Sequence, residues 1–206
     1  MNRTVLLALG IFFTIAASVT GLVIIPNWQF QDLKPVVKAT GLQYPERYFG
    51  DAHKGREIYI NQGCIYCHSQ QVREKGYGGD LRRGWGTRRS VPRDYIFDRP
   101  HQLGTMRTGP DLANIGVRQP SVEWHALHLY DPQITSSGSV MPRFNYLFTE
   151  VRASDATRPP ANAIKIPASD KRAGGVKYIV PTERGTQLIT YLKRLNQSYP
   201  LPEAQQ

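Results

Sequence analysis

The amino-acid sequence predicts an all-α protein with long loops, attached to a single N-terminal membrane-spanning helix. Three observations support this fold class. The N-terminus carries a long uncharged apolar run, a helical pattern begins at Asp51, and a second amphipathic helical pattern follows Pro181. The 18 glycines and 15 prolines predict that much of the remaining chain is irregular.

Residues 4–25 form an uncharged run of 22 residues, and about 20 are needed to cross a bilayer as a helix. We expect Pro26 to end this helix and Trp28 to lie at the interface between lipid and water. Arg3 is the only charge before the run, which predicts that the N-terminus stays inside. The alternative is a cleaved signal peptide, whose apolar region usually has only about 7–15 residues. The length therefore favours a retained transmembrane anchor at residues 1–26.

A linker at residues 27–50, broken by prolines and glycines, precedes the first helix of the second part of the chain. Asp51 is the expected N-cap of this helix. Gly55 would allow another helix to approach closely. One face of the helix should carry Ala52, Gly55 and Ile58 or Tyr59.

Two further helices are predicted, one of them short. The first covers residues 121–129 with Ser121 as its N-cap, and the second follows Thr182. The stretches 74–110 and 131–180 are expected to be irregular. The apolar stripe of the last helix consists of Leu188, Tyr191 or Leu192, and Leu195.

The chemistry is concentrated in the sequence Cys64-Ile65-Tyr66-Cys67-His68, which contains both cysteines of the chain. This spacing is the attachment pattern of haem c. Two thiols three residues apart on a helical turn can both add to haem vinyl groups, and His68 can then bind the iron. A zinc site would need further Cys or His pairs, and a thioredoxin-like dithiol would need a βαβ context; the sequence predicts neither. One covalent haem c is therefore expected.

The sixth iron ligand decides between an electron carrier and an open, reactive iron. Met106 and Met141 are the candidates, and the residues alone favour neither. His125 and His128 share one face of the predicted short helix, where packing is the more usual role. Pro110, in a Gly-Pro-Asp-Leu turn, could offer its carbonyl to the iron-bound histidine, although a plain turn is the simpler interpretation.

The net charge of +10 is compatible with nucleic acid, anionic lipid or an acidic protein as partner. No zinc-finger spacing, RNP-like strand or basic zipper is present, so no nucleic-acid partner is predicted. A group of arginines in the 74–110 stretch is either a solvated loop, compensation for haem propionates, or a docking face for an acidic partner, which we favour. These residues are Arg82, Arg83, Arg88, Arg89 and Arg93.

Several motifs occur in an order that resembles subunit II of the cbb3-type cytochrome c oxidases, the mono-haem membrane-anchored subunit. They are Gly55-Arg56-Glu57-Ile58-Tyr59, Gly63 to Gln70, Arg107 to Leu112, Trp124-His125-x-x-His128-Leu129, Asp131-Pro132, Met141-Pro142, and Val180-Pro181-Thr182 before Tyr191-Leu192.

This resemblance implies a class I cytochrome c fold. Cys64 and Cys67 would form the thioethers, His68 would be the proximal iron ligand, Met141 the distal ligand, and Pro110 would orient His68. The cytochrome domain would cover residues 51–200, with insertions near 71–106 and 150–178, and a tail at 201–206.

The implied function is electron transfer in aerobic respiration, from a donor cytochrome c to the catalytic oxidase subunit, with no active site in this chain itself. The implied partners are that subunit, other cytochrome c subunits and membrane lipid. The implied location is the bacterial inner membrane, with one span and the haem domain on the periplasmic side. The alternatives are the cytochrome c subunit of a nitric oxide reductase and a haem sensor with an open iron position.

Overall fold

The computed structural model describes residues 3–104, 106–152, 159–167 and 174–204. The chain divides into two compact units. The first contains residues 1–45 and 92–96, and the second contains residues 46–91 and 97–206. The predicted insertion at 150–178 and the predicted tail at 201–206 are described only in part, because 153–158, 168–173 and 205–206 lie outside the described residues.

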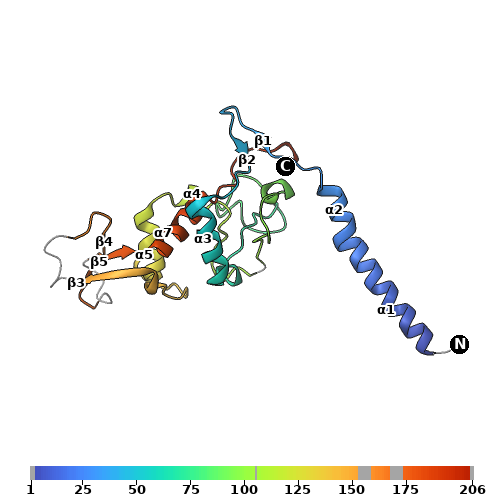
Figure 1. The fold of residues 1–206 in the computed structure, drawn as a ribbon, viewed down its shortest axis with the longest axis horizontal. Coiled ribbons are helices and arrows are strands. Elements are labelled where there is room, and N and C mark those ends of the chain that lie inside the picture. The colour runs from blue at the N-terminus through green and yellow to red at the C-terminus, as the bar shows by residue number, and fades with distance from the viewer. Residues whose placement is uncertain (1–2, 105, 153–158, 168–173, 205–206) are drawn as a thin grey trace. The chain divides into compact units, whose positions relative to one another are not determined.

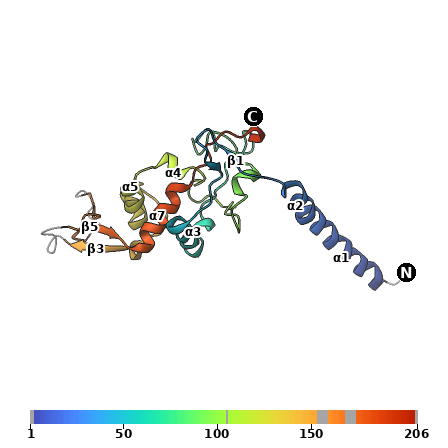
Figure 2. The same ribbon diagram turned by 45° about the horizontal axis from the view of Figure 1, so that its top comes forward.

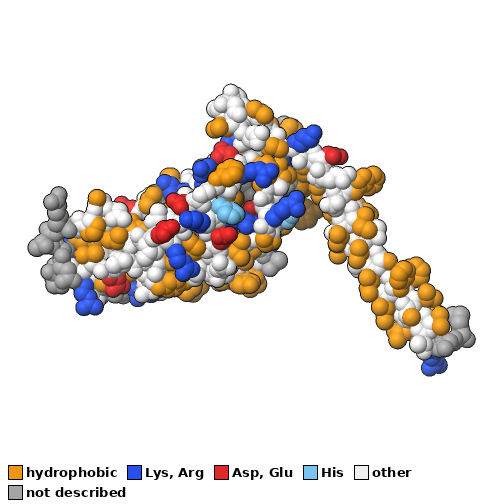
Figure 3. Space-filling view, in the orientation of Figure 1, with side chains coloured by type: hydrophobic (Ala, Val, Ile, Leu, Met, Phe, Trp, Pro, Cys, Tyr) orange, Lys and Arg blue, Asp and Glu red, His pale blue; other side chains and the backbone are white. Residues whose placement is uncertain are grey.

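The first unit begins with a helix from Arg3 to Phe30, long and apolar enough to cross a membrane and with none of its apolar window buried. It consists of α1 (Arg3–Val19), the π-helical turn η1 (Thr20–Ile24) and α2 (Ile25–Phe30). Hydrophobic side chains cover its surface in the space-filling view (Figure 3).

The prediction that Pro26 ends this helix is wrong, since Pro26 occupies the first turn of α2. A proline lacks the N–H of the helical ladder and its ring crowds the preceding turn. The wider π-helical turn immediately before it relieves both problems, because an inserted π-turn shifts the hydrogen-bond pattern there.

The predicted linker contains a small antiparallel hairpin of β1 (Val36–Val37) and β2 (Gln43–Tyr44). The short 3₁₀ helix η3 (Pro92–Tyr95) belongs to the same unit. The Tyr44 hydroxyl donates a hydrogen bond of 2.5 Å to the Asp94 carboxylate, which ties η3 to the hairpin.

The second unit is built on helices α3 and α7, which lie side by side in both ribbon views (Figures 1 and 2). Gly55 permits their close contact, as predicted, because its missing side chain leaves room for the α7 backbone. The helices are α3 (Gly50–Asn61), α4 (Ile115–Arg118), α5 (Val122–Tyr130), α6 (Pro132–Thr135) and α7 (Glu183–Arg194). The 3₁₀ helices are η2 (Cys64–Tyr66), η4 (Asn145–Leu147) and η6 (Pro202–Ala204).

Two of the three predicted helix caps are confirmed. The Ser121 hydroxyl accepts the Trp124 N–H at the start of α5, and the Thr182 hydroxyl accepts the Gly185 N–H at the start of α7. The predicted cap at Asp51 is wrong, because α3 begins one residue earlier and Phe49 holds the cap position without a side-chain bond. Asp51 instead lies in the first helical turn, where its negative charge interacts favourably with the helix dipole.

The predicted all-α class I cytochrome c fold is wrong. The structure is 43% helix and 10% strand, with two small sheets, so strands are a real part of the architecture. The larger sheet has the order β3-β5-β4 and is antiparallel. Its strands are β3 (Phe148–Arg152), β4 (Ile164–Lys165) and β5 (Val176–Pro181), and all but the last residue of β5 lie in the region expected to be irregular.

The sheet forms because β3 and β5 carry aromatic and β-branched residues that suit a half-buried pleated surface. Phe148 and Ile179 are buried, whereas Glu150 and Lys177 are exposed. The buried side chains join the same core as the helices. This core includes Tyr59 from α3, Leu127 and Tyr130 from α5, and Leu188, Tyr191 and Leu192 from α7.

Candidate haem-binding site

The Cys64–His68 segment follows directly on the end of α3. Gly63 adopts a left-handed conformation with φ of 71°, which glycine tolerates best, and the chain then enters the 3₁₀ turn η2. The His68 N–H donates to the Cys64 carbonyl at 3.0 Å, so the segment is a tight helical turn. Cys64 is half-buried and Cys67 is exposed.

The His68 imidazole is buried, and its Nδ1 lies 2.7 Å from the Pro110 carbonyl oxygen. A carbonyl can only accept, so Nδ1 carries the proton and the lone pair is left on Nε2. Burial lowers the pKa of His68, while the Pro110 carbonyl and the Asp111 carboxylate partly offset this effect. The hydrogen bond thus fixes the tautomer in which the Nε2 lone pair can bind a metal.

Glycines give the imidazole its space. A Cβ at Gly109 would lie 2.3 Å from Cε1 and 2.9 Å from Nε2 of His68, so any side chain there would displace the ring. A Cβ at Gly104 would lie 2.6 Å from the His68 carbonyl oxygen. The Gly109 N–H also donates to the Cys67 carbonyl at 2.9 Å, which holds the Pro110 turn against the motif.

An apolar cavity with about 530 Å³ of space free of atoms, part of it open to solvent, lies beside these residues. Four of the predicted site residues line it, while Cys67 is not among its lining residues. The predicted residues in the wall are Cys64, His68, Pro110 and Met141. Apolar residues complete it, among them Leu112, Ile115, Leu129, Leu188 and Leu192.

The structure separates the two candidate methionines. Met141 is half-buried, lines the cavity and packs against the core. Met106 is 58% exposed and does not belong to the cavity wall. An imidazole with Nδ1 bonded to a carbonyl, a half-buried thiol and a thioether around an apolar cavity are groups that could hold a haem.

His125 and His128 also line this cavity. Nε2 of His125 lies 2.8 Å from the Gln119 carbonyl oxygen, and Nδ1 of His128 lies 2.5 Å from the Thr135 hydroxyl. His128 stacks on Trp124 at a ring-centroid distance of 4.6 Å. Burial lowers the pKa of His128 to about 4, so this imidazole is neutral near pH 7. Both histidines are thus packed wall residues with one ring nitrogen already engaged.

Comparison with protein families decides the identity of the chain. Residues 2–197 match the family described as "Cytochrome C oxidase, mono-heme subunit/FixO". The chain belongs to this family. No curated protein sequence matches it. The family agrees with the predicted resemblance to subunit II of the cbb3-type oxidases, and it implies a haem cofactor and association with other oxidase subunits. The family is membrane-bound, consistent with the apolar helix Arg3–Phe30.

The sequence did not reveal a buried ionic cluster beside the site of this oxidase subunit. Asp80 and Asp111 are buried, and Arg107 bridges them, with N–O distances of 2.7 Å to Asp80 and 3.7 Å to Asp111. Ser69 connects the cluster to the residue after His68, because its hydroxyl donates to Asp111 at 2.6 Å. The only local sign in the sequence was the proximity of Arg107 and Asp111 to Pro110.

The arginines of the 74–110 stretch are not one solvated patch. Arg88 is buried and donates to the Tyr199 carbonyl at 2.7 Å, and Arg89 donates to the Glu203 carbonyl at 2.7 Å. Two of the five thus hold the C-terminal segment of the subunit. Arg82 and Arg83 are exposed, and the Arg83 guanidinium lies over the Trp85 ring.

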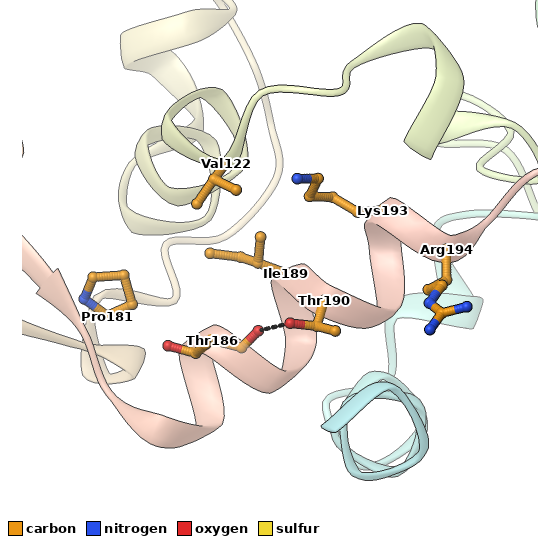
Figure 4. A pocket seen from close by; sticks show the side chains of 7 residues that line it. All are labelled: Val122, Pro181, Thr186, Ile189, Thr190, Lys193 and Arg194. Atoms are coloured by element: carbon orange, nitrogen blue, oxygen red, sulfur yellow. Dashed lines mark hydrogen bonds between the residues drawn. The ribbon is translucent and has the colours of Figure 1, made fainter. Parts of the chain in front are cut away.

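A second hollow of the oxidase subunit lies between α7 and the start of α5 (Figure 4). Buried Ile189 contributes to its wall, and the Thr190 hydroxyl donates to the Thr186 carbonyl at 2.8 Å. Its lining offers two cations but no histidine, cysteine or carboxylate, so it does not resemble a metal site. The lining residues are Val122, Pro181, Thr186, Ile189, Thr190, Lys193 and Arg194.

Proposed function

We propose that this subunit is a mono-haem c-type cytochrome that passes electrons from a donor cytochrome c to the catalytic subunit of a cbb3-type oxidase. The observation that carries the proposal is the placement of His68. Its Nδ1 is committed to Pro110, and its imidazole lines an apolar cavity together with Cys64 and Met141. A haem bound there would supply a one-electron Fe(III)/Fe(II) couple.

In this proposal each residue has a separate task. Cys64 and Cys67 would attach one haem through thioethers. His68 would hold the iron through Nε2, with the Pro110 carbonyl fixing the orientation of the ring. Met141 would be the second protein ligand of the iron, and a fully ligated iron favours electron transfer over ligand binding.

The covalent haem is tested on the purified oxidase complex. The denatured subunit should keep haem-linked peroxidase colour on a gel and keep it after acid-acetone extraction. The variant with Cys64→Ala and Cys67→Ala should lose the colour. A subunit that releases its haem on extraction would contradict covalent attachment.

The distal ligand is tested with the two methionines as a matched pair. Met141→Ala should abolish the weak methionine-to-iron charge-transfer band of the oxidised subunit, because the thioether is removed. Met106→Ala should leave the band unchanged, since this side chain is exposed. Loss of the band in Met106→Ala alone would show that Met106, and not Met141, binds the iron. An unchanged band in both variants would exclude methionine ligation.

We propose that the helix Arg3–Phe30 is a retained single-pass anchor in the bacterial inner membrane, with the haem domain on the periplasmic side. The length and hydropathy of the helix and the single charge before it support this topology. The subunit should resist extraction by salt and carbonate, and protease added to the periplasmic side should reach the haem domain. A mature N-terminus near Val19 would indicate cleavage instead.

The electron-transfer route is tested by purification from membranes and by stopped-flow reduction. We expect the subunit to co-purify with the catalytic oxidase subunit and with other cytochrome c subunits. Its haem should be reduced by a donor cytochrome c and reoxidised when oxygen is added. Co-purification with a nitric oxide reductase catalytic chain would favour the alternative function.

A further inference from the structure

A buried carboxylate lies directly behind the Pro110 carbonyl that holds His68. Asp111 has an exposed fraction of 0%. Its carboxylate accepts hydrogen bonds from the Ser69 hydroxyl at 2.6 Å, the Gln71 N–H at 2.7 Å and the Ala113 N–H at 2.8 Å. Hydrogen bonds from such donors favour the charged form of a carboxylate.

Backbone hydrogen bonds fix this carboxylate relative to the imidazole. The Gly109 N–H donates to the Cys67 carbonyl at 2.9 Å, and the Leu112 N–H donates to the Ser69 carbonyl at 2.8 Å. The two chain segments that carry His68 and Asp111 are therefore joined by one hydrogen bond before these residues and one after them. The charge of Asp111 is held at a fixed distance from the ring.

The other charges in contact with this cluster divide into two groups. Arg107 forms two hydrogen bonds of 2.7 Å with Asp80 and lies 3.7 Å from Asp111, so its charge compensates mainly that of Asp80. Arg118 donates to the Asp111 backbone carbonyl. Asp111 is therefore the carboxylate bonded to the residue after His68, and Arg118 is the cation bonded to the Asp111 backbone.

We propose that Asp111 is a positioning residue that lowers the reduction potential of an iron bound to His68, and that Arg118 acts in the opposite direction. The proposal rests on the proposed function, since it requires iron at His68. Oxidised iron carries one more positive charge than reduced iron. A fixed buried anion stabilises the oxidised form, because charges interact strongly where water is excluded.

The experiment is a potentiometric titration of the purified oxidase complex, followed by the haem c absorbance. Asp111→Asn keeps the size of the side chain and removes its charge. We expect the equilibrium constant for reduction to rise about tenfold, which is about 59 mV for a one-electron couple. Arg118→Gln should shift the potential in the opposite direction and by less.

Asp98→Asn is the matched control. Asp98 is also buried and paired with an arginine, Arg56, at 3.0 Å, but it is not among the groups that act on His68. Its removal should leave the potential unchanged. A purely structural role of Asp111 would weaken haem retention or stability without giving shifts of opposite sign in the two charge variants.

Each outcome supports or contradicts the proposal. An intact haem c spectrum with an unchanged potential in Asp111→Asn would overturn it, as would an equal shift in Asp98→Asn. If Asp111→Asn fails to retain haem, Arg118→Gln decides, and a potential that does not fall contradicts the proposal. Absence of a covalent haem spectrum from the wild-type subunit would instead be a failure of the proposed function.

Discussion

Gly55 in α3 lies directly against the backbone of Gln187 in α7. A Cβ added at Gly55 would lie 1.9 Å from the Gln187 carbonyl oxygen and 2.8 Å from the Tyr191 Cβ. Gly55→Ala must therefore push the two helices apart. We expect it to reduce the free energy of unfolding by about 1–3 kcal/mol, the usual cost of overpacking. Haem retention should fall with it, because α7 contributes Leu188 and Leu192 to the cavity.

Gly79→Ala is the control for this prediction. A Cβ at Gly79 would meet only the ends of the Arg82 and Arg83 side chains, at 3.5 Å, which is an ordinary contact distance. Denaturant midpoints of both variants, measured on the intact subunit, give the comparison. Equal stability of Gly55→Ala and Gly79→Ala would show that the helices separate at no cost.

The sequence alone predicts the helices that carry the site, because helix caps and apolar spacing are signals between residues close together in the chain. Ser121 and Thr182 precede apolar patterns with helical spacing, and a side-chain cap acts on the next three residues only. The same reasoning placed the cap of α3 wrongly, since Phe49 offers no capping side chain and Asp51, two residues later, resembles a cap. The sequence could not show that a π-helical turn precedes Pro26, because this turn is a shift of backbone hydrogen bonds that no particular residue type marks.

The sheet and the ionic cluster depend on residues far apart in the chain, which explains why they were missed. Phe148 pairs with Pro181 across more than thirty residues, and each strand alone is too short to give a clear alternating pattern. Asp80 and Asp111 meet through Arg107 only after the loop has folded. The prediction of a haem-attachment site at Cys64, Cys67 and His68 needs only local sequence, because two thiols and a histidine occur within five residues, and these roles stay predictions.

Thr182 should stabilise the fold through two hydrogen bonds of its hydroxyl, of which the helix cap is only one. Its hydroxyl accepts the Gly185 N–H at 3.2 Å and donates to the Leu147 carbonyl at 2.9 Å, so it connects α7 to η4. Thr182→Ala should reduce the free energy of unfolding by about 1–2 kcal/mol, and Thr182→Ser should restore most of it, because serine keeps the hydroxyl. Denaturant unfolding checks both. An alanine variant as stable as wild type would assign the cap no energetic role.

The stability of the subunit should fall as the pH is lowered through 6.5. Burial lowers the pKa of His125 in the folded state below its ordinary value of 6.5. Below pH 6.5 the unfolded chain binds a proton that the folded chain does not, so acid favours unfolding. His125→Gln can still donate to the Gln119 carbonyl and carries no titrating group. The His125→Gln variant should therefore lose less free energy of unfolding than wild type between about pH 7.5 and about pH 5, two values on either side of the ordinary histidine pKa.

The control for the pH experiment is Ser121→Ala, which removes the α5 cap and should lower stability equally at every pH. A pH dependence that is the same in His125→Gln and in wild type would show that His125 is not the responsible group.

The last prediction concerns the C-terminal segment, residues 195–204. Leu201 and Ala204 in it are buried, and Arg88 and Arg89 donate to its Tyr199 and Glu203 carbonyls at 2.7 Å. Hydrogen bonds from a charged donor contribute about 1.5–3 kcal/mol. The variant with Arg88→Ala and Arg89→Ala should therefore release the segment, and limited proteolysis should cleave it faster than in wild type.

The matched control replaces two exposed cations of the same loop, with Lys75→Ala and Arg82→Ala. Both double variants remove two positive charges, so a general electrostatic effect on a soluble electron donor would change the salt dependence of the reduction rate in both. If Arg88 and Arg89 serve the C-terminal segment, only their removal accelerates cleavage, and the salt dependence stays similar in the two variants. A protease-resistant segment together with a salt dependence flattened only by Arg88→Ala and Arg89→Ala would instead assign these arginines to donor docking.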